Sequence, residues 1–323
     1  MAWLITGGAG YIGAHVTRVM NGAGEQVVAL DDLSAGHAGR LPQGVPLVHG
    51  SYLDGALLGR VCAEHGVTGV VHLAARKQVA ESVAQPERYY RENVGGLVTL
   101  LEAVAEAGVG RMLFSSSAAV YGNPDVDLIT EDTPCVPVNP YGETKLAGEW
   151  LVRAAGRAHG IATACLRYFN AAGAAAPELA DTGVSTIVPM VFDRLTRDEA
   201  PRVFGDDHPT PDGTCVRDYL HVADLADAHL AAARRLPRPD ASGDLTLNIG
   251  RGEGVSVREL LAAIGEATGD RRPPVVEARR PGDAPRAVAS AGRAAAELGR
   301  RARRGVPEMV SSAWRGWQAH HGS

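Results

Sequence analysis

The first half of the chain alternates short apolar runs with longer stretches of helical pattern. The apolar runs predict strands at Ala2–Thr6, Gln26–Leu30, Pro46–His49, Gly69–Leu73, Arg111–Ser115 and Ile161–Arg167. The stretches between them predict helices at about Tyr11–Gly22, Asp54–Glu64, Pro86–Ala107 and Pro140–His159. Strands that alternate with helices and are apolar along their whole length are typical of a parallel sheet covered on both faces. The sequence therefore predicts an α/β fold with a doubly wound parallel sheet.

The second half of the chain has a different rhythm. After about Phe169, Gly, Pro and Asp accumulate in residues 170–183 and again in 205–213. We therefore expect a first domain of residues 1–169 and a smaller C-terminal α/β lobe of residues 170–323, with the chain crossing back around 214–250. The local patterns predict helices at Thr186–Arg197, Asp218–Arg235 and Val257–Thr268, a surface loop at Leu236–Gly243 and a helix end within Trp314–Ser323.

Composition argues against several classes of partner. The 323 residues carry a formal net charge of −5, and Lys and Arg are scattered apart from the run Arg300–Arg304, so we expect no nucleic acid partner. The chain has no apolar run of about 18 residues and no leader pattern at Met1, so we expect a cytoplasmic protein with no membrane partner. The four cysteines are widely separated and have no histidine at ligand spacing, so we expect no metal site.

A glycine-rich turn follows the first predicted strand and reads Thr6-Gly7-Gly8-Ala9-Gly10-Tyr11-Ile12-Gly13. Glycines at such a turn let the backbone approach a pyrophosphate at the N-terminus of the next helix. Asp31 and Asp32 come at the end of the second strand, where a carboxylate accepts hydrogen bonds from a ribose diol and repels a 2′-phosphate. This pattern favours NAD as a cofactor. The alternative is a structural turn with a helix-capping aspartate.

Tyr141 and Lys145 lie about one helical turn apart, so their side chains share a face. An ammonium beside a phenol favours the phenolate and lowers its pKa, which predicts a tunable acid/base. Ser117 follows a predicted strand at the carboxyl edge, where open α/β sheets bind ligands. The alternatives are a pair on a solvated helix and a serine-rich strand end that satisfies backbone groups.

Taken together, the glycine-rich turn, Ser117 and the Tyr141/Lys145 pair resemble the extended short-chain dehydrogenase/reductase family, whose first domain is an NAD-binding Rossmann domain. Further segments narrow the resemblance to the UDP-glucose 4-epimerases of that family. They are Lys77–Pro86, Tyr89–Val94, Arg167–Gly173, Pro209–Val222 and Arg279–Asp283. The run Asp212-Gly-Thr-x-Val-Arg-Asp-Tyr219 is more particular to these epimerases than the cofactor motifs are.

The resemblance implies an isomerase that interconverts UDP-glucose and UDP-galactose through a transient 4-keto sugar. Tyr141 as phenolate would take the proton of the sugar 4-hydroxyl while hydride passes from C4 to tightly bound NAD⁺. Lys145, together with the cationic nicotinamide, would keep the tyrosine pKa near the working pH, and Ser117 would relay or orient the proton. The 4-keto sugar would then turn over, so that hydride returns to its opposite face.

Matching positions imply two sets of contacts. Toward NAD, the resemblance assigns Gly7, Gly10, Tyr11, Ile12, Gly13, Asp31, Asp32, Ser51, Tyr52, Leu73, Ala74, Lys77, Asn93, Ser117, Tyr141, Lys145 and Phe169. Toward the UDP-hexose, it assigns Lys77, Ser117, Tyr141, Asn170, Thr186, Val203, Phe204, Arg217, Arg280, Asp283 and Ala287. Arginine suits a diphosphate because its planar fork binds two oxygens at once. The alternative for Arg217 and Arg280 is a surface ion pair with Asp218 and Asp283.

Four positions depart from the pattern of the epimerases. Ser51 replaces an aspartate near the adenine, Ala119 a threonine beside Ser117, and Thr186 an asparagine near the sugar or diphosphate. Ala287 replaces a tyrosine that closes the sugar pocket in some relatives, so we expect room for an N-acetyl group at C2 and acceptance of UDP-N-acetylglucosamine and UDP-N-acetylgalactosamine.

Other activities on the same fold remain alternatives. A nucleotide-sugar 4,6-dehydratase needs an Asp-Glu pair just after the serine position, where this chain has Ala118 and Ala119. A UDP-glucuronate or dTDP-hexose 4-epimerase, a UDP-glucuronate decarboxylase and a catalytically dead NAD-sensing regulatory protein are the others. By analogy with relatives, we expect a homodimer through the helices at Pro86–Ala107 and Pro140–His159.

Overall fold

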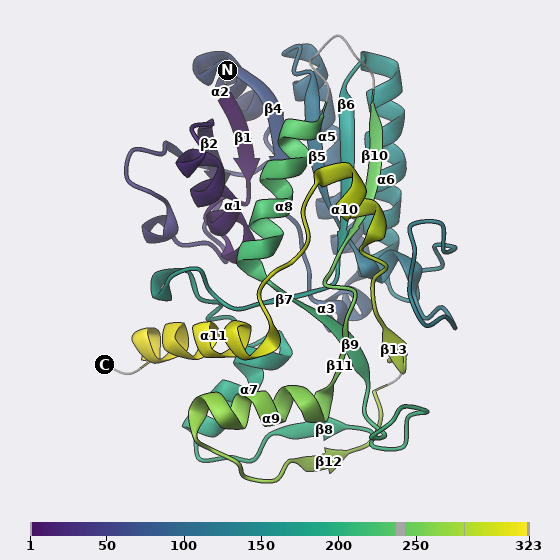
Figure 1. Cartoon of the computed structure of the whole chain (residues 1–323). Helices are drawn as coiled ribbons and strands as arrows, with labels where there is room; N and C mark the ends of the chain where they lie inside the picture. Colours follow the sequence, from purple (N-terminus) through teal and green to yellow (C-terminus); the bar gives the residue numbers. More distant parts are fainter. Residues whose placement is uncertain (1, 237–242, 281, 322–323) are drawn as a thin grey trace.

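The computed structural model describes residues 2–236, 243–280 and 282–321. Its main sheet has seven strands in the order β10-β6-β5-β4-β1-β2-β3, and every neighbouring pair is parallel (Figure 1). The strands are β1 (Ala2–Thr6), β2 (Gln26–Asp31), β3 (Leu47–His49), β4 (Val67–His72), β5 (Arg111–Ser117), β6 (Ala162–Tyr168) and β10 (Asp244–Ile249). The predicted α/β fold with a doubly wound parallel sheet is confirmed.

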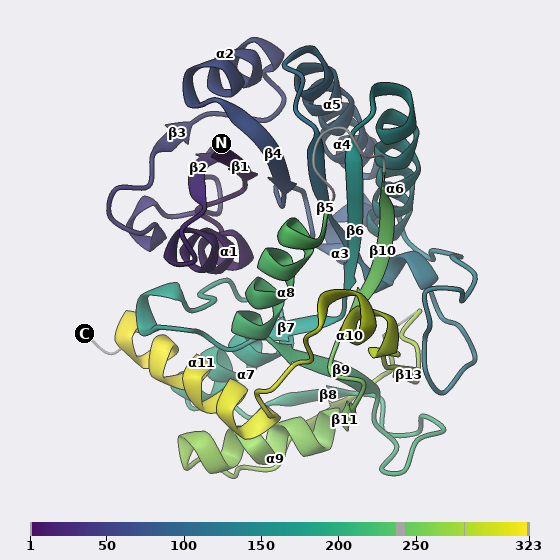
Figure 2. The same ribbon diagram turned by 45° about the horizontal axis from the view of Figure 1, so that its top comes forward.

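Helices cover both faces of this sheet (Figure 1 and Figure 2). One face carries α1 (Tyr11–Gly22) and α8 (Val222–Arg235), and the other carries α2 (Gly55–His65), α5 (Gly96–Glu106) and α6 (Pro140–His159). The strand β1 is apolar along its whole length because its successive residues pack on opposite, covered faces of the sheet. Trp3 and Ile5 pack toward α1 and α8, whereas Leu4 packs toward α2 and α5.

The second half of the chain contributes to this sheet as well as to a smaller unit. β10 pairs with β6 at the sheet edge, and α8 packs beside α1. The smaller unit has a four-stranded sheet of β7 (Asn170–Ala172), β9 (Val216–His221), β11 (Gly254–Ser256) and β13 (Arg286–Ala287). A two-stranded sheet of β8 (Arg202–Phe204) and β12 (Val275–Glu277) lies below it.

The remaining helices complete the smaller unit and the connections. They are α3 (Val79–Ala84), α4 (Pro86–Tyr89), α7 (Ile187–Thr196), α9 (Val257–Thr268), α10 (Gly292–Leu298) and α11 (Val306–His321). A core cluster that includes Phe192, Leu260 and Trp317 holds α7, α9 and α11 together. The rings of Phe192 and Trp317 pack 6.0 Å apart.

Two predicted helices differ from the observed ones. The prediction of a helix at Asp218–Arg235 is wrong for residues 218–221, which belong to β9. The predicted helix Pro86–Ala107 is interrupted, because the π-helical segment Tyr90–Gly95 separates α4 from α5. Most of the predicted loop Leu236–Gly243, and the last two residues of the predicted helix end, lie outside the described residues.

Candidate active site

The glycine-rich turn between β1 and α1 is shaped by close backbone contacts. Gly7 has φ +70°, and a Cβ there would lie 2.8 Å from the backbone nitrogen of Ala74. A Cβ at Gly13 would lie 1.9 Å from the carbonyl oxygen of Gly7. α1 begins at Tyr11, and its N-cap, Gly10, offers no side chain to the N–H groups of the first turn. A turn limited to glycine at such a helix start fits the pyrophosphate of a dinucleotide.

The loop after β4 lies against this turn. The N–H groups of Leu73 and Ala74 both donate to the carbonyl oxygen of Thr6, each at 3.1 Å. On the other side, the Tyr11 hydroxyl donates to the carbonyl oxygen of Gly173 at 2.6 Å. The structure therefore brings the glycine-rich turn next to Leu73 and Ala74, which the resemblance also assigns to NAD.

The two aspartates after β2 have different environments. Asp31 is buried, and its carboxylate oxygens accept the N–H groups of Ala9 and Leu33, each at 2.9 Å. Asp32 is exposed, and one of its oxygens accepts both the N–H and the hydroxyl of Ser34. Burial raises the pKa of Asp32, but these hydrogen bonds outweigh it and hold that pKa below its ordinary value. Asp31 thus fixes the glycine-rich turn, while Asp32 presents a carboxylate at the surface.

Ser51, which is predicted near the adenine, and Tyr52, which is predicted at the cofactor, lie after β3. The hydroxyl of Ser51 accepts the N–H of Leu53 at 3.2 Å. The Tyr52 hydroxyl donates to the carbonyl oxygen of Glu92 at 2.9 Å, and its ring stands edge-on to His72. Both side chains are partly exposed, so a ligand can reach them.

Asn93 and Lys77, which the resemblance places at the cofactor, differ in their contacts. Asn93 is buried, and its amide accepts the N–H of Arg76 at 2.8 Å and donates to the carbonyl oxygen of the same residue at 3.0 Å. The Asn93 amide also donates to the Thr144 hydroxyl at 3.1 Å. It therefore ties the loop after β4 to α6. Lys77 is exposed in that loop.

Ser117, Tyr141 and Lys145 come together at the carboxyl end of β5. Ser117 is the last residue of that strand, and its hydroxyl accepts the N–H of Ala119 at 3.1 Å. Its side chain also lies close enough to Tyr141 to lower the pKa of that phenol. Tyr141 lies in the first turn of α6. The buried Lys145 ammonium donates to the carbonyl oxygen of Ser115 at 2.7 Å and lies 5.9 Å from the centre of the Tyr141 ring. The predicted catalytic group is therefore assembled.

The acid–base properties of this group differ from the prediction. Burial raises the pKa of Tyr141, and the side chain of Ser117 lowers it by a smaller amount. Burial lowers the pKa of Lys145 to about 8, and the carboxylate of Glu149 opposes this effect. The expectation of a Tyr141 pKa below its ordinary value is therefore wrong for the protein's own residues, because burial of the phenol outweighs the groups that favour the phenolate.

Arg217 is the central cation of the predicted substrate side. One of its Nη atoms donates to the carbonyl oxygens of Ala284 at 2.7 Å and Val216 at 3.0 Å. The other lies 3.4 Å from the carboxylate of Asp283. The ion pair of Arg217 with Asp283 is thus observed. Asp218 instead turns inward and accepts N–H groups of the loop that follows β10.

The other predicted substrate residues lie on several elements and connecting loops of the smaller unit. Arg280 is exposed, and its guanidinium lies 3.7 Å from the centre of the Phe204 ring in β8. Asn170 opens β7, opposite Tyr219 of β9. Thr186 is the exposed N-cap of α7 and donates to Asp181 at 3.3 Å. The buried Val203 is the neighbour of Phe204.

Ala287 and Phe169 connect the two sides of the site. Ala287 pairs with Arg217 across β13 and β9. It also packs against the small core cluster that contains the buried Phe169 and Tyr121. The resemblance assigns Phe169 to NAD and Ala287 to the UDP-hexose, and these two residues belong to one packing unit.

Three polar residues beneath the site were not predicted. Ser116, Glu149 and Arg167 form a buried hydrogen-bonded cluster between β5, α6 and β6. A weak sequence signal existed, because Glu149 follows Lys145 by one helical turn and Arg167 opens the segment Arg167–Gly173.

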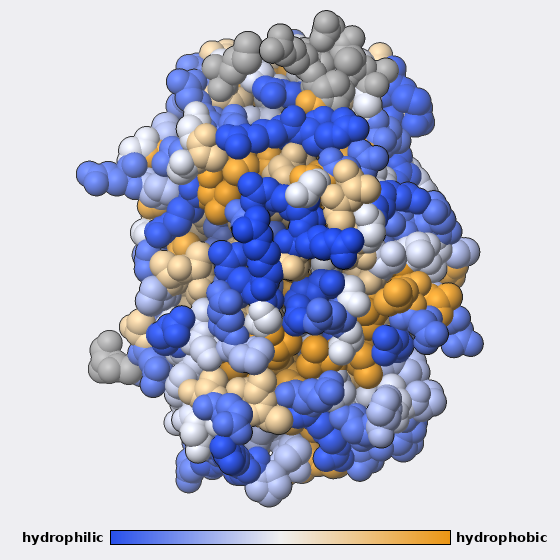
Figure 3. Space-filling model, viewed as in Figure 1, coloured by the Kyte–Doolittle hydropathy of each residue, from blue (hydrophilic) through white to orange (hydrophobic). Residues whose placement is uncertain are grey.

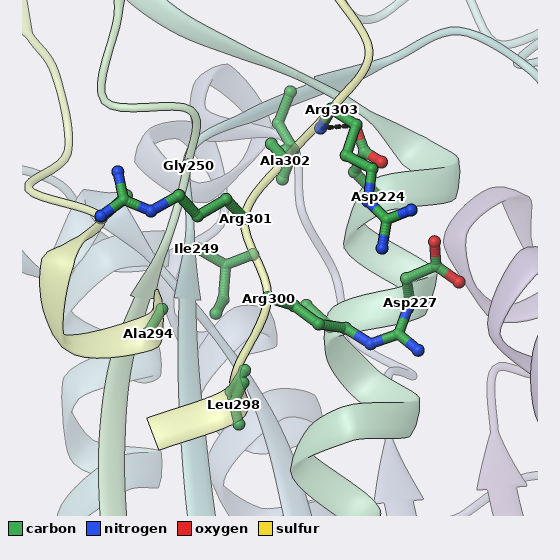
Figure 4. A pocket seen from close by; sticks show the side chains of 13 residues that line it. Asp224, Asp227, Ile249, Gly250, Ala294, Leu298, Arg300, Arg301, Ala302 and Arg303 are labelled. Atoms are coloured by element: carbon green, nitrogen blue, oxygen red, sulfur yellow. Dashed lines mark hydrogen bonds between the residues drawn. The ribbon is translucent and has the colours of Figure 1, made fainter. Parts of the chain in front are cut away.

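A separate hollow lies between α8, the end of β10 and residues 298–303, and Figure 4 shows it. Its charged lining includes Asp224, Asp227 and Arg301, and it contains none of the predicted site residues. In the face shown in Figure 3, hydrophilic residues gather over this part of the molecule.

Within residues 2–236, 243–280 and 282–321, no helix is long and apolar enough to cross a membrane, and no cluster of three or more His, Cys, Asp or Glu is placed to hold a metal ion.

A family model described as the NAD dependent epimerase/dehydratase family matches residues 3–250 of this chain. A UDP-glucose 4-epimerase of Azospirillum brasilense is 47% identical over 302 residues, which are 92% of this chain and 86% of that protein. A UDP-glucose 4-epimerase of Streptomyces lividans is 43% identical and covers 99% of this chain and 96% of its own length.

Solved structures show the same likeness. A UDP-glucose-4-epimerase from Stenotrophomonas maltophila, with bound NAD and formylated UDP-arabinopyranose, is 37% identical with a TM-score of 0.93 and covers 100% of this chain and 99% of its own. A UDP-glucose 4-epimerase from Bifidobacterium longum, in complex with NAD⁺ and UDP, is 35% identical with a TM-score of 0.92 and covers the same shares.

Proposed function

Because the chain belongs to the NAD dependent epimerase/dehydratase family, and within it to the UDP-glucose 4-epimerases, we propose that it interconverts UDP-glucose and UDP-galactose with NAD as its cofactor. The observation that carries the proposal is the group at the end of β5. Ser117 lies close enough to Tyr141 to lower the pKa of the phenol, and the buried Lys145 ammonium lies 5.9 Å from the centre of the Tyr141 ring. This is the arrangement that a reversible oxidation of a secondary alcohol requires.

NAD⁺, when bound in the glycine-rich turn, supplies the acceptor and later the donor of the C4 hydride. Tyr141 takes the proton of the sugar 4-hydroxyl during oxidation and returns a proton when the opposite C4 centre forms. Ser117, whose side chain lies beside Tyr141, orients this proton. Lys145 keeps a positive charge near the phenol, which favours the phenolate once both groups face the ligands.

The residues of the smaller unit hold the nucleotide diphosphate. Arg217 is fixed by the Ala284 carbonyl and by Asp283, so its fork is oriented before a ligand arrives. Arg280 stacks on Phe204 and supplies a second cation. The sugar has fewer fixed partners, which allows the 4-keto intermediate to turn over between the two hydride transfers.

The competing activities lack the groups that they need. Ala118 and Ala119 follow Ser117, so the acid and base of a 4,6-dehydratase are absent from the position where that family carries them. A dead NAD-sensing protein is disfavoured because Ser117, Tyr141 and Lys145 are all in place. The cytoplasmic location stays a prediction.

The decisive experiment is product analysis of the purified protein. We expect NAD to copurify or to restore activity, and we expect UDP-galactose to give UDP-glucose at equilibrium. UDP-glucuronate and a dTDP-hexose should turn over far more slowly. Turnover of either of these in place of UDP-galactose would overturn the proposed substrate.

The size of Ala287 supports a wider sugar pocket. Ala287 lies on β13 beside Arg217 and packs toward Phe169, where a small side chain leaves room for a C2 N-acetyl group. We expect turnover of UDP-N-acetylgalactosamine beside that of UDP-galactose. Ala287→Tyr should abolish turnover of UDP-N-acetylgalactosamine and retain turnover of UDP-galactose, as measured by separate initial rates. Good UDP-galactose turnover without any turnover of the N-acetyl sugar in the parent protein would contradict this.

An exposed apolar surface supports the proposal of a homodimer. Trp150 of α6 is 59% exposed and Val83 of α3 is 63% exposed, and Tyr90 and Val98 are exposed on the segments packed against α6. Such a patch marks an interaction surface in a water-soluble fold. Trp150→Glu should convert the dimer to a monomer in light scattering, whereas Val275→Glu, at an exposed apolar position on β12, should not.

A further inference from the structure

A fully enclosed acid–base cluster lies beneath the candidate active site, and the mechanism above does not use it. The Glu149 side chain is 0% exposed and that of Arg167 is 4% exposed. One oxygen of Glu149 accepts the Ser116 hydroxyl at 2.5 Å and Arg167 Nε at 2.7 Å. The other accepts Arg167 Nη2 at 2.6 Å and Arg153 Nη2 at 3.3 Å. The carboxylate therefore has four donors, and three of them belong to the arginines of β6 and α6.

The cluster joins the elements that carry the catalytic group. Ser116 directly precedes Ser117 on β5, and Glu149 follows Lys145 by one turn of α6. Arg167 lies on β6, where it pairs in register with Ser116. The Glu149 carboxylate thus sets the position of α6 relative to the strand end that presents Ser117.

Arg167 anchors the cluster on its far side. Its Nη1 donates to the Tyr121 hydroxyl at 2.9 Å, and that hydroxyl donates to Asn248 at 2.7 Å. A buried ion pair is a poor source of net stability, because the cost of desolvating two charges offsets their attraction. Its presence below the site is therefore better explained by orientation and charge than by stability.

The surroundings of the Lys145 ammonium make the charge of Glu149 important. The groups that face it are the Ser115 carbonyl and the Phe114 ring on β5, Tyr141 on its own helix, His72 on β4 and Glu149. His72 has its pKa lowered to about 3, mainly by burial, so it is neutral near pH 7 and adds no charge. Burial lowers the pKa of Lys145, and the carboxylate that opposes this is Glu149.

We propose that Glu149 is a positioning residue that, through Ser116 and Arg167, fixes α6 against β5 and β6 and supplies the counter-charge that keeps Lys145 an ammonium beside Tyr141. This inference rests on the proposed function, since it assigns a role within the same catalytic group. In this role Glu149 does not contact substrate or cofactor. It acts through Lys145 and Ser117.

The first test is the pH profile of kcat/KM for UDP-galactose with the NAD-bound protein. Glu149→Gln removes the carboxylate charge and leaves Arg167, so Lys145 loses its proton at a lower pH. We expect the alkaline limb to move down by about one pH unit. Glu149→Asp restores the charge and should move the limb back toward that of the parent. Glu64→Gln, an exposed position on α2, is the matched control and should leave the profile unchanged.

The result separates positioning from a purely structural role. Lower turnover at every pH alike, with the alkaline limb unmoved in both Glu149 variants, would overturn the inference. If Glu149→Gln does not fold because Arg167 is left unpaired, Glu149→Asp decides the question alone. Its shorter side chain draws the carboxylate toward the α6 backbone and away from Ser116 and Arg167, so its alkaline limb should still lie measurably below that of the parent.

A second readout does not depend on turnover, so it distinguishes failure of this inference from failure of the proposed function. Carbon-13 NMR of protein labelled at the lysine Cε atoms follows the ionisation of Lys77 and Lys145, which are the two lysines of the sequence. Loss of the Glu149 charge should lower the pH at which Lys145 loses its proton in Glu149→Gln and leave that of the exposed Lys77 unchanged. Equal titration of Lys145 in parent and variant would contradict the inference even in a protein with no epimerase activity.

Discussion

The two sides of the candidate active site are built in different ways. On the side of the seven-stranded sheet, Gly7 and Gly13 are in backbone contacts that leave no space for a Cβ, and Lys145 is buried. On the side of the smaller unit, Arg280 is exposed and its guanidinium lies over the face of the Phe204 ring. Arg217 is held by an ion pair with Asp283 and by hydrogen bonds to two backbone carbonyls.

This difference suggests a division of labour. A close-packed turn suits a cofactor that stays bound and must present its reactive face at a constant position. Long side chains on short strands suit a ligand that arrives, is held by its charge and leaves. Small changes on the side of the seven-stranded sheet should therefore cause large losses of turnover or of bound NAD. Changes on the side of the smaller unit should cause graded losses of substrate affinity.

The largest expected effect is at the phenol. Tyr141→Phe removes the proton acceptor and keeps the ring, so turnover should fall by about 10²- to 10⁴-fold, the usual contribution of acid–base catalysis. NAD content should be unchanged, because the glycine-rich turn is untouched. Tyr90→Phe, which removes an exposed hydroxyl that donates to Glu143, is the control. Near-parental rates in Tyr141→Phe would show that the sheet side does not carry the chemistry.

The next effect tests how close-packed the cofactor side is. Gly13→Ala places a methyl group 1.9 Å from the Gly7 carbonyl oxygen, so the turn must open. We expect NAD content, measured after denaturation, to fall at least about tenfold. Gly22→Ala at the other end of α1 meets nothing within 4 Å and should bind NAD normally. It should also gain up to about 1 kcal/mol of stability, because alanine favours the helix.

Some of this architecture could be predicted from local sequence. The helix Pro140–His159 has the observed ends because Asn139 accepts the N–H of Gly142 and Gly160 closes the helix in the left-handed conformation. These are local signals, and they do not depend on the rest of the fold. The same holds for the glycine-rich turn before α1.

Other features depend on residues far apart in the chain. Asp218 fits a helical pattern, yet it lies in β9 because its carboxylate accepts the N–H groups of Arg251, Gly252 and Ala289. The pKa of Tyr141 was misjudged because its burial comes from packing and not from its spacing to Lys145. Neither the hydrogen bonds of Asp218 nor the burial of Tyr141 can be predicted from local sequence.

A graded effect is expected on the substrate side. Arg217→Lys keeps the charge and loses the fork, so KM for UDP-galactose should rise by about tenfold, within the value of a charged hydrogen bond. kcat should change much less, because the group at Ser117 is intact. Arg271→Lys, an exposed arginine paired with Glu266, is the control. A loss in kcat as large as that of Tyr141→Phe would remove the distinction between the two sides.

The smallest effects come from two helix caps, one on each side. Asn139 caps α6 just before Tyr141, and Ser256 caps α9 in the smaller unit. Replacing either by alanine should cost about 1 kcal/mol of unfolding free energy, as measured by denaturant titration. Asn139→Ala should also lower kcat, because the first turn of α6 carries the phenol, whereas Ser256→Ala should leave kcat unchanged. Equal kcat in both variants, at equal loss of stability, would mean that the start of α6 is held by Glu149 and its partners and does not need its cap.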